Sequence, residues 1–173
     1  CQALADFLTI KEEFGSFDDL VLSFVGDGNN VANSLILCGA ILGIEVRVAC
    51  PRGFEPNNTI LNKAFEINPN NKIVITHDPE EACLNSNILY TDVWSSMGEE
   101  DEKDSKDRSF DGFSINNILL KKAQKDAIVL HCLPAYRGKE ITDEVIEGQN
   151  SRVFEQAENR LHVQQALLAT LLS

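Results

Sequence analysis

Five short apolar runs alternate with helical patterns along this chain, and this alternation constrains the fold more than any other feature. Each run is rich in Val, Ile and Leu and is bounded by polar residues or glycine, which is typical of a buried strand. The runs cover residues 21–26, 44–50, 72–76, 87–92 and 127–131. Helical patterns cover residues 2–14, 32–42, 58–67, 79–84, 114–123 and 155–172. The alternation predicts an α/β, Rossmann-like domain of three layers, with a central parallel sheet of about five strands and helices on both faces.

Length and charge limit the classes of function. The chain has 173 residues, 43% of them hydrophobic, which is enough for one globular domain with a buried core. Its formal net charge of −12 argues against nucleic acid and anionic membranes as partners, because both attract clustered Lys and Arg. No apolar run approaches the roughly 20 residues of a membrane span. The cysteines show neither close pairing nor metal-ligand spacing, so we expect reduced thiols in a cytosol-like compartment and no bound metal.

The first strand runs into a glycine turn, Gly26-Asp27-Gly28-Asn29-Asn30, that opens a helix. Backbone N–H groups at such a helix start favour an anion. A dinucleotide site is the main alternative, but the third glycine of its fingerprint would fall at Val31, and the second strand ends in Ala49-Cys50 without the acid that holds ribose. Asn29 and Asn30 could equally serve only to cap the helix.

The fourth strand is followed by Asp92-Val93-Trp94-Ser95-Ser96-Met97-Gly98, and then by a segment crowded with charges, residues 98–108. A carboxylate and a hydroxyl at a strand end could hold an ammonium group, and the charged segment could close over it. The alternatives are that Asp92 caps a turn and that the charged segment is a solvated loop.

The fifth strand ends in His131-Cys132-Leu133-Pro134, which adds an imidazole and a thiol to the same edge. A buried histidine and cysteine can also be inert core residues. In the last helical pattern, Arg160 could hold carboxylate or phosphate oxygens, or it could pair with Glu155 or Glu158. Open α/β sheets bind ligands at the carboxyl edge, so polar groups at three strand ends favour a binding crevice there.

Together these motifs resemble the transcarbamylases, and in particular the ornithine-binding domain of the ornithine carbamoyltransferases. The likeness covers nearly the whole chain, so residues 1–173 are expected to be a single domain that includes the start of the interdomain helix and the C-terminal helix. The carbamoyl-phosphate-binding half of the family is expected to be absent. The Ser96-Met97-Gly98 triplet is similar to the ornithine enzyme rather than to its aspartate, putrescine or acetylornithine relatives. The matching segments follow family order: Cys1-Gln2 as the end of a His-Pro-x-Gln motif, Gly26 through Asn30, Asp92 through Gly98, His131 through Pro134, and Glu158-Asn159-Arg160.

The resemblance implies transfer of a carbamoyl group from carbamoyl phosphate to the side-chain amine of L-ornithine, which gives L-citrulline and phosphate without a metal or an organic cofactor. His131 and Pro134 would support the site, and the Leu133–Pro134 peptide is expected to be cis. The implied ornithine contacts are Asn30 and the backbone of Met97 for the α-carboxylate, and Asp92 and Ser96 for the α-ammonium. The implied contacts to the carbamoyl group are Gln2, Cys132, the Leu133 carbonyl and Arg160, with Cys132 as a proton acceptor and Arg160 on the carbamoyl oxygen.

The resemblance also implies a homotrimer for the full-length protein and a role in arginine biosynthesis or the urea cycle. The isolated domain is expected to be monomeric and inactive, since it lacks the cationic loop that would hold carbamoyl phosphate. The expected location is the cytoplasm, or the mitochondrial matrix or plastid stroma in a eukaryote. The alternatives are a nicotinamide-dinucleotide-binding Rossmann domain and a non-catalytic amino-acid-binding relative; the second would be expected to lack Cys132, Arg160 or the Ser96-Met97-Gly98 triplet, and all are present.

Overall fold

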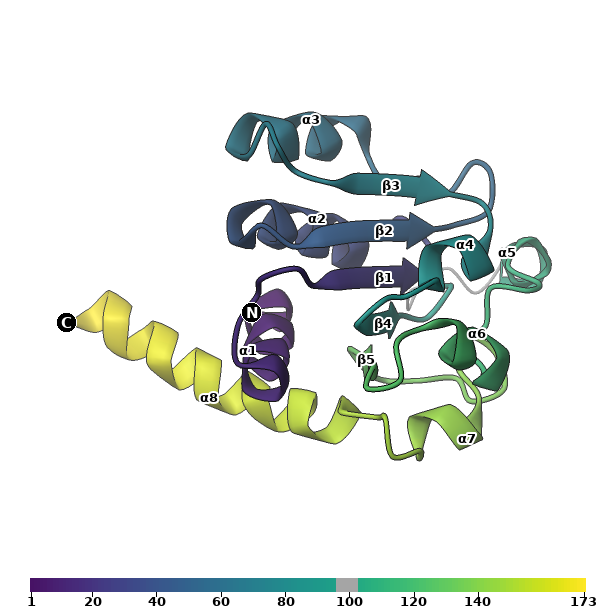
Figure 1. Ribbon diagram of the computed structural model, residues 1–173. Helices are drawn as coiled ribbons and strands as arrows, with labels where there is room; N and C mark the ends of the chain where they lie inside the picture. Colours follow the sequence, from purple (N-terminus) through teal and green to yellow (C-terminus); the bar gives the residue numbers. More distant parts are fainter. Residues whose placement is uncertain (96–102) are drawn as a thin grey trace.

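The computed structural model describes residues 1–95 and 103–173, which form a parallel five-stranded sheet between layers of helices (Figure 1). The sheet order is β3-β2-β1-β4-β5, and every neighbouring pair is parallel. Each strand lies inside one of the five predicted runs, so the predicted fold is confirmed. The strands are β1 (Val21–Val25), β2 (Glu45–Ala49), β3 (Ile73–Thr76), β4 (Ile88–Thr91) and β5 (Ile128–His131).

The helices fill the connections between the strands and both ends of the described chain. Six of them match the predicted helical patterns to within a few residues: α1 (Gln2–Phe14), α2 (Asn30–Leu42), α3 (Asn58–Ile67), α4 (Pro79–Cys83), α6 (Asn117–Lys122) and α8 (Val153–Leu172). The loop alternative for the charged segment is wrong in its second part, where α5 (Lys103–Ser109) forms, and α7 (Asp143–Ile146) was not predicted at all. Neither short helix has a repeating apolar stripe, and α5 ends directly before Phe110, a fully buried ring that anchors it to the core.

Side chains that alternate along the strands build a core on each face of the sheet. On one face, Tyr90 and Leu130 pack with buried residues of α1, α2 and α3. On the other, Leu89 and Val129 pack with buried residues of α4, α6 and α7. Burial of each such apolar side chain stabilises the fold by about 1.5–3 kcal/mol, so the sheet holds its strand ends in fixed positions.

The strand order reverses direction beside β1. The chain builds outward from β1 to β3, and then crosses to the other side of β1 to add β4 and β5. In parallel sheets such a reversal leaves a crevice at the carboxyl ends of the two strands that flank it. The ends of β1 and β4 are tied together there, because the Thr91 hydroxyl donates a hydrogen bond to the Val25 carbonyl at 2.6 Å.

Helices α1 and α8 pack against each other, so segments from the two ends of the sequence lie side by side (Figure 1). The far part of α8 extends beyond the sheet and exposes Leu168, Leu171 and Leu172. Within the described ranges, no helix has the length and apolar character needed to cross a membrane.

Candidate functional site

The glycine turn places the start of α2 at the carboxyl edge of the sheet. A side chain at position 28 could not fit, because a Cβ there would lie 2.4 Å from the backbone nitrogen of Pro56. Asn29 caps α2 through its Oδ1, which accepts hydrogen bonds from the backbone N–H groups of Val31 at 2.9 Å and Ala32 at 3.3 Å. Asn30, the predicted carboxylate contact, is the first residue of the helix and its side chain is exposed.

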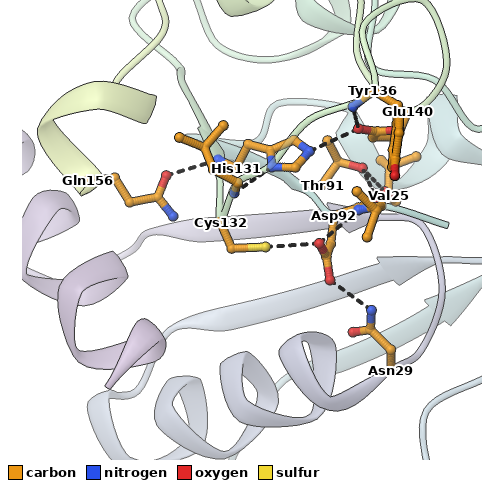
Figure 2. A network of polar contacts seen from close by, with 11 residues as sticks. Val25, Asn29, Thr91, Asp92, His131, Cys132, Tyr136, Glu140 and Gln156 are labelled. Atoms are coloured by element: carbon orange, nitrogen blue, oxygen red, sulfur yellow. Dashed lines mark hydrogen bonds and ion pairs between the residues drawn. The ribbon is translucent and has the colours of Figure 1, made fainter. Parts of the chain in front are cut away.

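Asp92 is the centre of a polar cluster at the ends of β1, β4 and β5 (Figure 2). Its Oδ2 accepts a hydrogen bond from Nδ2 of Asn29 at 2.9 Å, and its Oδ1 accepts one from Sγ of Cys132 at 2.9 Å. The backbone N–H of Val93 also donates to Oδ1 at 2.8 Å. The turn-capping alternative therefore describes only one of three bonds, and the other two join Asp92 to α2 and β5.

The Cys132 thiol is a hydrogen-bond donor in this arrangement. Burial raises its pKa far above the usual value, and the negative charge of Asp92 raises it further. Cys132 is therefore protonated at neutral pH in the ligand-free domain. Its proton is held by the carboxylate, so any role in accepting a proton first requires that this proton move away.

His131 is fully enclosed beside the same cluster, with both ring nitrogens engaged (Figure 2). Its Nδ1 accepts a hydrogen bond from the backbone N–H of Leu133 at 2.9 Å, so Nε2 carries the ring hydrogen. That Nε2 donates to Oε1 of Glu140 at 3.2 Å. The expected cis peptide between Leu133 and Pro134 is present in the turn that follows. The histidine therefore fixes the turn that carries Cys132 and Leu133.

A second polar cluster joins α1 to α8. Arg160 donates from Nη1 to Oε1 of Gln2 at 2.7 Å, across a sequence separation of 158 residues. Gln2 in turn donates from Nε2 to Oδ1 of Asp6 at 2.7 Å. The alternative partners Glu155 and Glu158 make no such contact with Arg160 in the described structure, and Glu158 instead lies 3.9 Å from His162. Two predicted site residues from opposite ends of the sequence are therefore in direct contact.

The two clusters are connected through Gln156. Its Oε1 accepts a hydrogen bond from the backbone N–H of His131 at 2.9 Å, and its Nε2 donates to Asp6 at 2.7 Å. A continuous path of hydrogen bonds thus runs from Arg160 to the end of β5. This path positions the predicted carbamoyl contacts relative to the cluster around Asp92.

Part of the predicted closing segment also reaches this edge. Lys106 of α5 pairs with Asp27 of the glycine turn at 2.7 Å and lies over the ring of Phe54. Ser96 and Met97, which were predicted to contact ornithine, lie outside the described residues, as do residues 98–102 of the charged segment.

Sequence reasoning missed three residues that the structure places in these clusters: Asp6, Asn29 as a partner of Asp92, and Glu140. The acid Glu140 follows His131 by nine residues, in a stretch with no strand or helix signal. Its Oε2 is buried without a hydrogen-bond partner among the described residues. A buried histidine needs a partner for each nitrogen, and that requirement was the only available signal for Glu140.

Asp92, His131 and Cys132 could also provide metal ligands, since one ligand atom from each lies within 4.8 Å of the others. Each of these atoms is already engaged in a hydrogen bond inside the protein. A metal ion would therefore have to displace those bonds and the thiol proton.

Comparison with known proteins decides the family. The family described as "Aspartate/ornithine carbamoyltransferase, Asp/Orn binding domain" matches residues 18–171. The chain belongs to this family. As a member of the aspartate/ornithine carbamoyltransferase family, it carries the Asp/Orn-binding domain, and the nicotinamide-binding alternative is set aside.

Individual relatives agree with that membership. An ornithine carbamoyltransferase of Prochlorococcus marinus strain MIT 9312 is 70% identical over 174 residues, which cover 100% of this chain and 56% of the relative. The ornithine carbamoyltransferase of Pyrococcus furiosus has a solved structure that is 46% identical with a TM-score of 0.93, covering 98% of this chain and 55% of that one. A structure from Gloeobacter violaceus is 48% identical with a TM-score of 0.90, covering 100% and 58%. The chain therefore spans about half the length of the relatives it matches.

Proposed function

We propose that this chain is the ornithine-binding half of an enzyme that transfers the carbamoyl group of carbamoyl phosphate to the side-chain amine of L-ornithine, in arginine biosynthesis. The observation that carries the proposal is the pair of adjoining clusters. A carboxylate and a thiol lie at the strand ends, and an arginine and an amide lie on α1 and α8. The first suits an amine substrate, and the second suits the polar atoms of a carbamoyl group.

Ornithine would occupy the crevice around Asp92. Its α-ammonium would contact Asp92 and Ser96, and its α-carboxylate would contact Asn30 and the backbone of Met97. The geometry of Asp92 supports this role, because two of its three donors come from other elements and can give way to an ammonium group. A charge-assisted bond of this kind is roughly twice as strong as a neutral one.

The reacting amine must lose a proton before it attacks, since an alkyl ammonium group has a pKa near ~10.4. Cys132 is the proposed acceptor, but its thiol is protonated in the ligand-free domain. Sγ donates to Oδ1 of Asp92 at 2.9 Å in the ligand-free domain, and once the ornithine ammonium group takes its place, the thiol proton would be released to solvent while Asp92 stays ionised. The approaching cationic amine favours the thiolate, and the thiolate then takes the amine proton.

Arg160, Gln2 and the Leu133 carbonyl would hold the carbamoyl group. Negative charge grows on the carbamoyl oxygen as the amine adds, and a preorganised guanidinium stabilises that charge. Leu133 lies in the turn fixed by His131, so its carbonyl would be held beside Cys132. No metal or organic cofactor enters this scheme.

Carbamoyl phosphate itself would be held largely by a second domain, since the described clusters hold one arginine and no cationic loop. We therefore propose that the isolated domain is inactive. As the family resemblance implies, we also propose that the isolated domain is monomeric and that the full-length enzyme is a cytoplasmic homotrimer. Size-exclusion chromatography of the domain and of the full-length enzyme tests the proposed oligomeric states.

Ornithine titration of the domain tests the binding proposal, with the fluorescence of Trp94 as the signal. Trp94 is nearly buried and stacks on Phe110. We expect saturable binding that weakens by at least tenfold in Asp92→Asn, because one charge-assisted bond is lost. Norvaline, which lacks the side-chain amine, should also bind, but it has no amine to contact Cys132. The exposed Asp126→Asn variant loses the same charge and should bind as the wild type does.

A domain that fails to bind at millimolar ornithine would require the same titration on the full-length enzyme with carbamoyl phosphate present. An unchanged ornithine affinity of Asp92→Asn in that enzyme would exclude Asp92 from the site. Citrulline formation by the full-length enzyme tests the reaction itself, and its absence would overturn the proposed function.

A further inference from the structure

Asp6 is a carboxylate with 0% of its surface exposed, and it lies beside the Gln2–Arg160 pair. Its Oδ1 accepts hydrogen bonds from Nε2 of Gln2 and Nε2 of Gln156, both at 2.7 Å, and its Oδ2 accepts one from the Tyr90 hydroxyl at 3.1 Å. A buried carboxylate is costly unless its oxygens are well bonded, and three donors from three elements meet this requirement. Asp6 has no exposed surface through which to touch a substrate, so it can act only through its neighbours.

The neighbours of Gln2 fix the direction of its side-chain amide. The NH₂ end faces the Asp6 carboxylate, and the oxygen end accepts from the Arg160 guanidinium at 2.7 Å. The reversed amide would place its NH₂ against the guanidinium, which only donates, and its oxygen against the carboxylate, which only accepts. One orientation therefore satisfies both neighbours, and the other satisfies neither.

The fixed amide gives the pair a definite hydrogen-bonding pattern. A carbonyl oxygen has two lone pairs, and Arg160 uses one of those on Gln2, so an acceptor remains. The guanidinium has five N–H groups and donates one of them to Gln2. The pair therefore offers an acceptor beside donors, which complements a group that carries an NH₂ next to a carbonyl oxygen.

We propose that Asp6 is a positioning residue that directs the Gln2 amide oxygen toward the substrate, and so makes the site select a carbamoyl group over an acyl group of the same shape. This inference rests on the proposed function. An acetyl group has a methyl in place of the NH₂, so it leaves the Gln2 acceptor unpaired. Sites built to bond a polar group reject analogues that lack it much more strongly than apolar pockets reject an added group.

The test compares two inhibitors of the full-length enzyme that compete with carbamoyl phosphate. Phosphonoacetamide carries the amide NH₂, and acetonylphosphonate carries a methyl in its place; both have the same phosphonate. We expect wild-type enzyme to prefer phosphonoacetamide by at least tenfold. Asp6→Leu removes the acceptor for Gln2, and the ratio of inhibition constants should fall by about tenfold. General damage to the site would weaken both inhibitors alike and leave the ratio unchanged.

Asp6→Asn is the conservative variant. Its amide oxygen can occupy the position of Oδ1 and accept from Gln2, while its NH₂ faces the Tyr90 hydroxyl. We expect it to keep the inhibitor ratio within about threefold of the wild type. The exposed Asp18→Asn variant serves as a charge control and should match the wild type.

A ratio that is unchanged in Asp6→Leu, or that falls as far in Asp6→Asn as in Asp6→Leu, would overturn the inference. If Asp6→Leu does not fold, Asp6→Ala takes its place, since it also removes the acceptor for Gln2; a tenfold drop in the ratio supports the inference, and an unchanged ratio overturns it. Wild-type enzyme that forms no citrulline would refute the proposed function instead, so the two failures are distinguishable.

Discussion

The two acids at the centre of the polar clusters are built differently. Asp92 lies at a strand end, is 8% exposed, and takes donors from a helix cap, a thiol and its own turn. Asp6 lies between two helices, has no exposed surface, and takes donors from side chains only. The difference indicates separate tasks. Asp92 can exchange its donors for those of a ligand, whereas Asp6 can only hold other side chains in place.

The largest effect that the comparison predicts is a loss of turnover when Arg160, the partner of Gln2, is removed. In the full-length enzyme, Arg160→Ala should lower kcat by about 10²–10³-fold, because one preorganised donor to the developing charge is lost. The ornithine Michaelis constant should change by less than about threefold, since the Asp92 cluster is untouched. Steady-state kinetics measures both. The exposed Arg52→Ala variant is the matched control, and wild-type turnover in Arg160→Ala would remove this residue from the site.

A smaller effect is expected on stability, and it concerns the titration of Asp6. Burial raises the pKa of the Asp6 carboxyl to about 6, against the opposing effect of its hydrogen-bond donors. The folded state then holds a proton that the unfolded state releases near pH 4, so this residue costs stability increasingly as the pH rises from about 4 to about 6. Between pH 4 and 7 the free energy of unfolding of the wild type should fall by roughly 2–3 kcal/mol relative to Asp6→Asn.

Urea unfolding of the domain across this pH range measures the difference. Asp6 raises the pKa of the Tyr90 hydroxyl and of the thiols of Cys38 and Cys132. None of them is expected to change its charge between pH 4 and 7, so the slope can be assigned to Asp6. If the free energies of unfolding of the wild type and Asp6→Asn change with pH in parallel, the Asp6 carboxyl titrates as an exposed acid does.

The smallest effect concerns the thiol beside Asp92. Burial and then the charge of Asp92 raise the pKa of Cys132, so iodoacetamide should modify it slowly at pH 8. Asp92→Asn removes that charge and should speed the modification several-fold, because more thiolate is present. Mass spectrometry of the Cys132 peptide gives the rate, and the exposed Cys1 provides an internal reference whose rate should not change. An equal rate in both proteins would show that burial alone suppresses the thiol.

The sequence predicted the site residues that directly follow strands. Period and composition located all five strands, and polar residues at the ends of β1, β4 and β5 could therefore be placed on one edge before any coordinates were known. The same reasoning identified Asp92 and Cys132, which directly follow the neighbouring strands β4 and β5. Residues that meet through sheet pairing are predictable because the order of a parallel sheet has few alternatives.

Contacts that depend on helix packing were not predictable in this way. Asp6 lies four residues after Gln2 and four before Ile10, so it falls on the buried stripe of α1, but nothing local identifies Tyr90 or Gln156 as its partners. Family resemblance, rather than pattern, brought Gln2 into the site, and it favoured a ligand-holding role for Arg160 over pairing with Glu155 or Glu158. Helix α7 was missed for a related reason, because one short turn contains too few residues for a period to show.

At the N-cap of α2, unlike at other helices, asparagine and aspartate are not interchangeable. Asn57, Asp78 and Asn116 begin other helices with side-chain oxygens that accept backbone N–H bonds, a task that Asn and Asp perform about equally well. Asn29 performs the same task with its oxygen, and uses its nitrogen to donate to Asp92. Aspartate in its place would still begin the helix but would set two carboxylates against each other. The identity of this one capping residue is therefore dictated by the carboxylate that it bonds after β4 rather than by the helix that it starts.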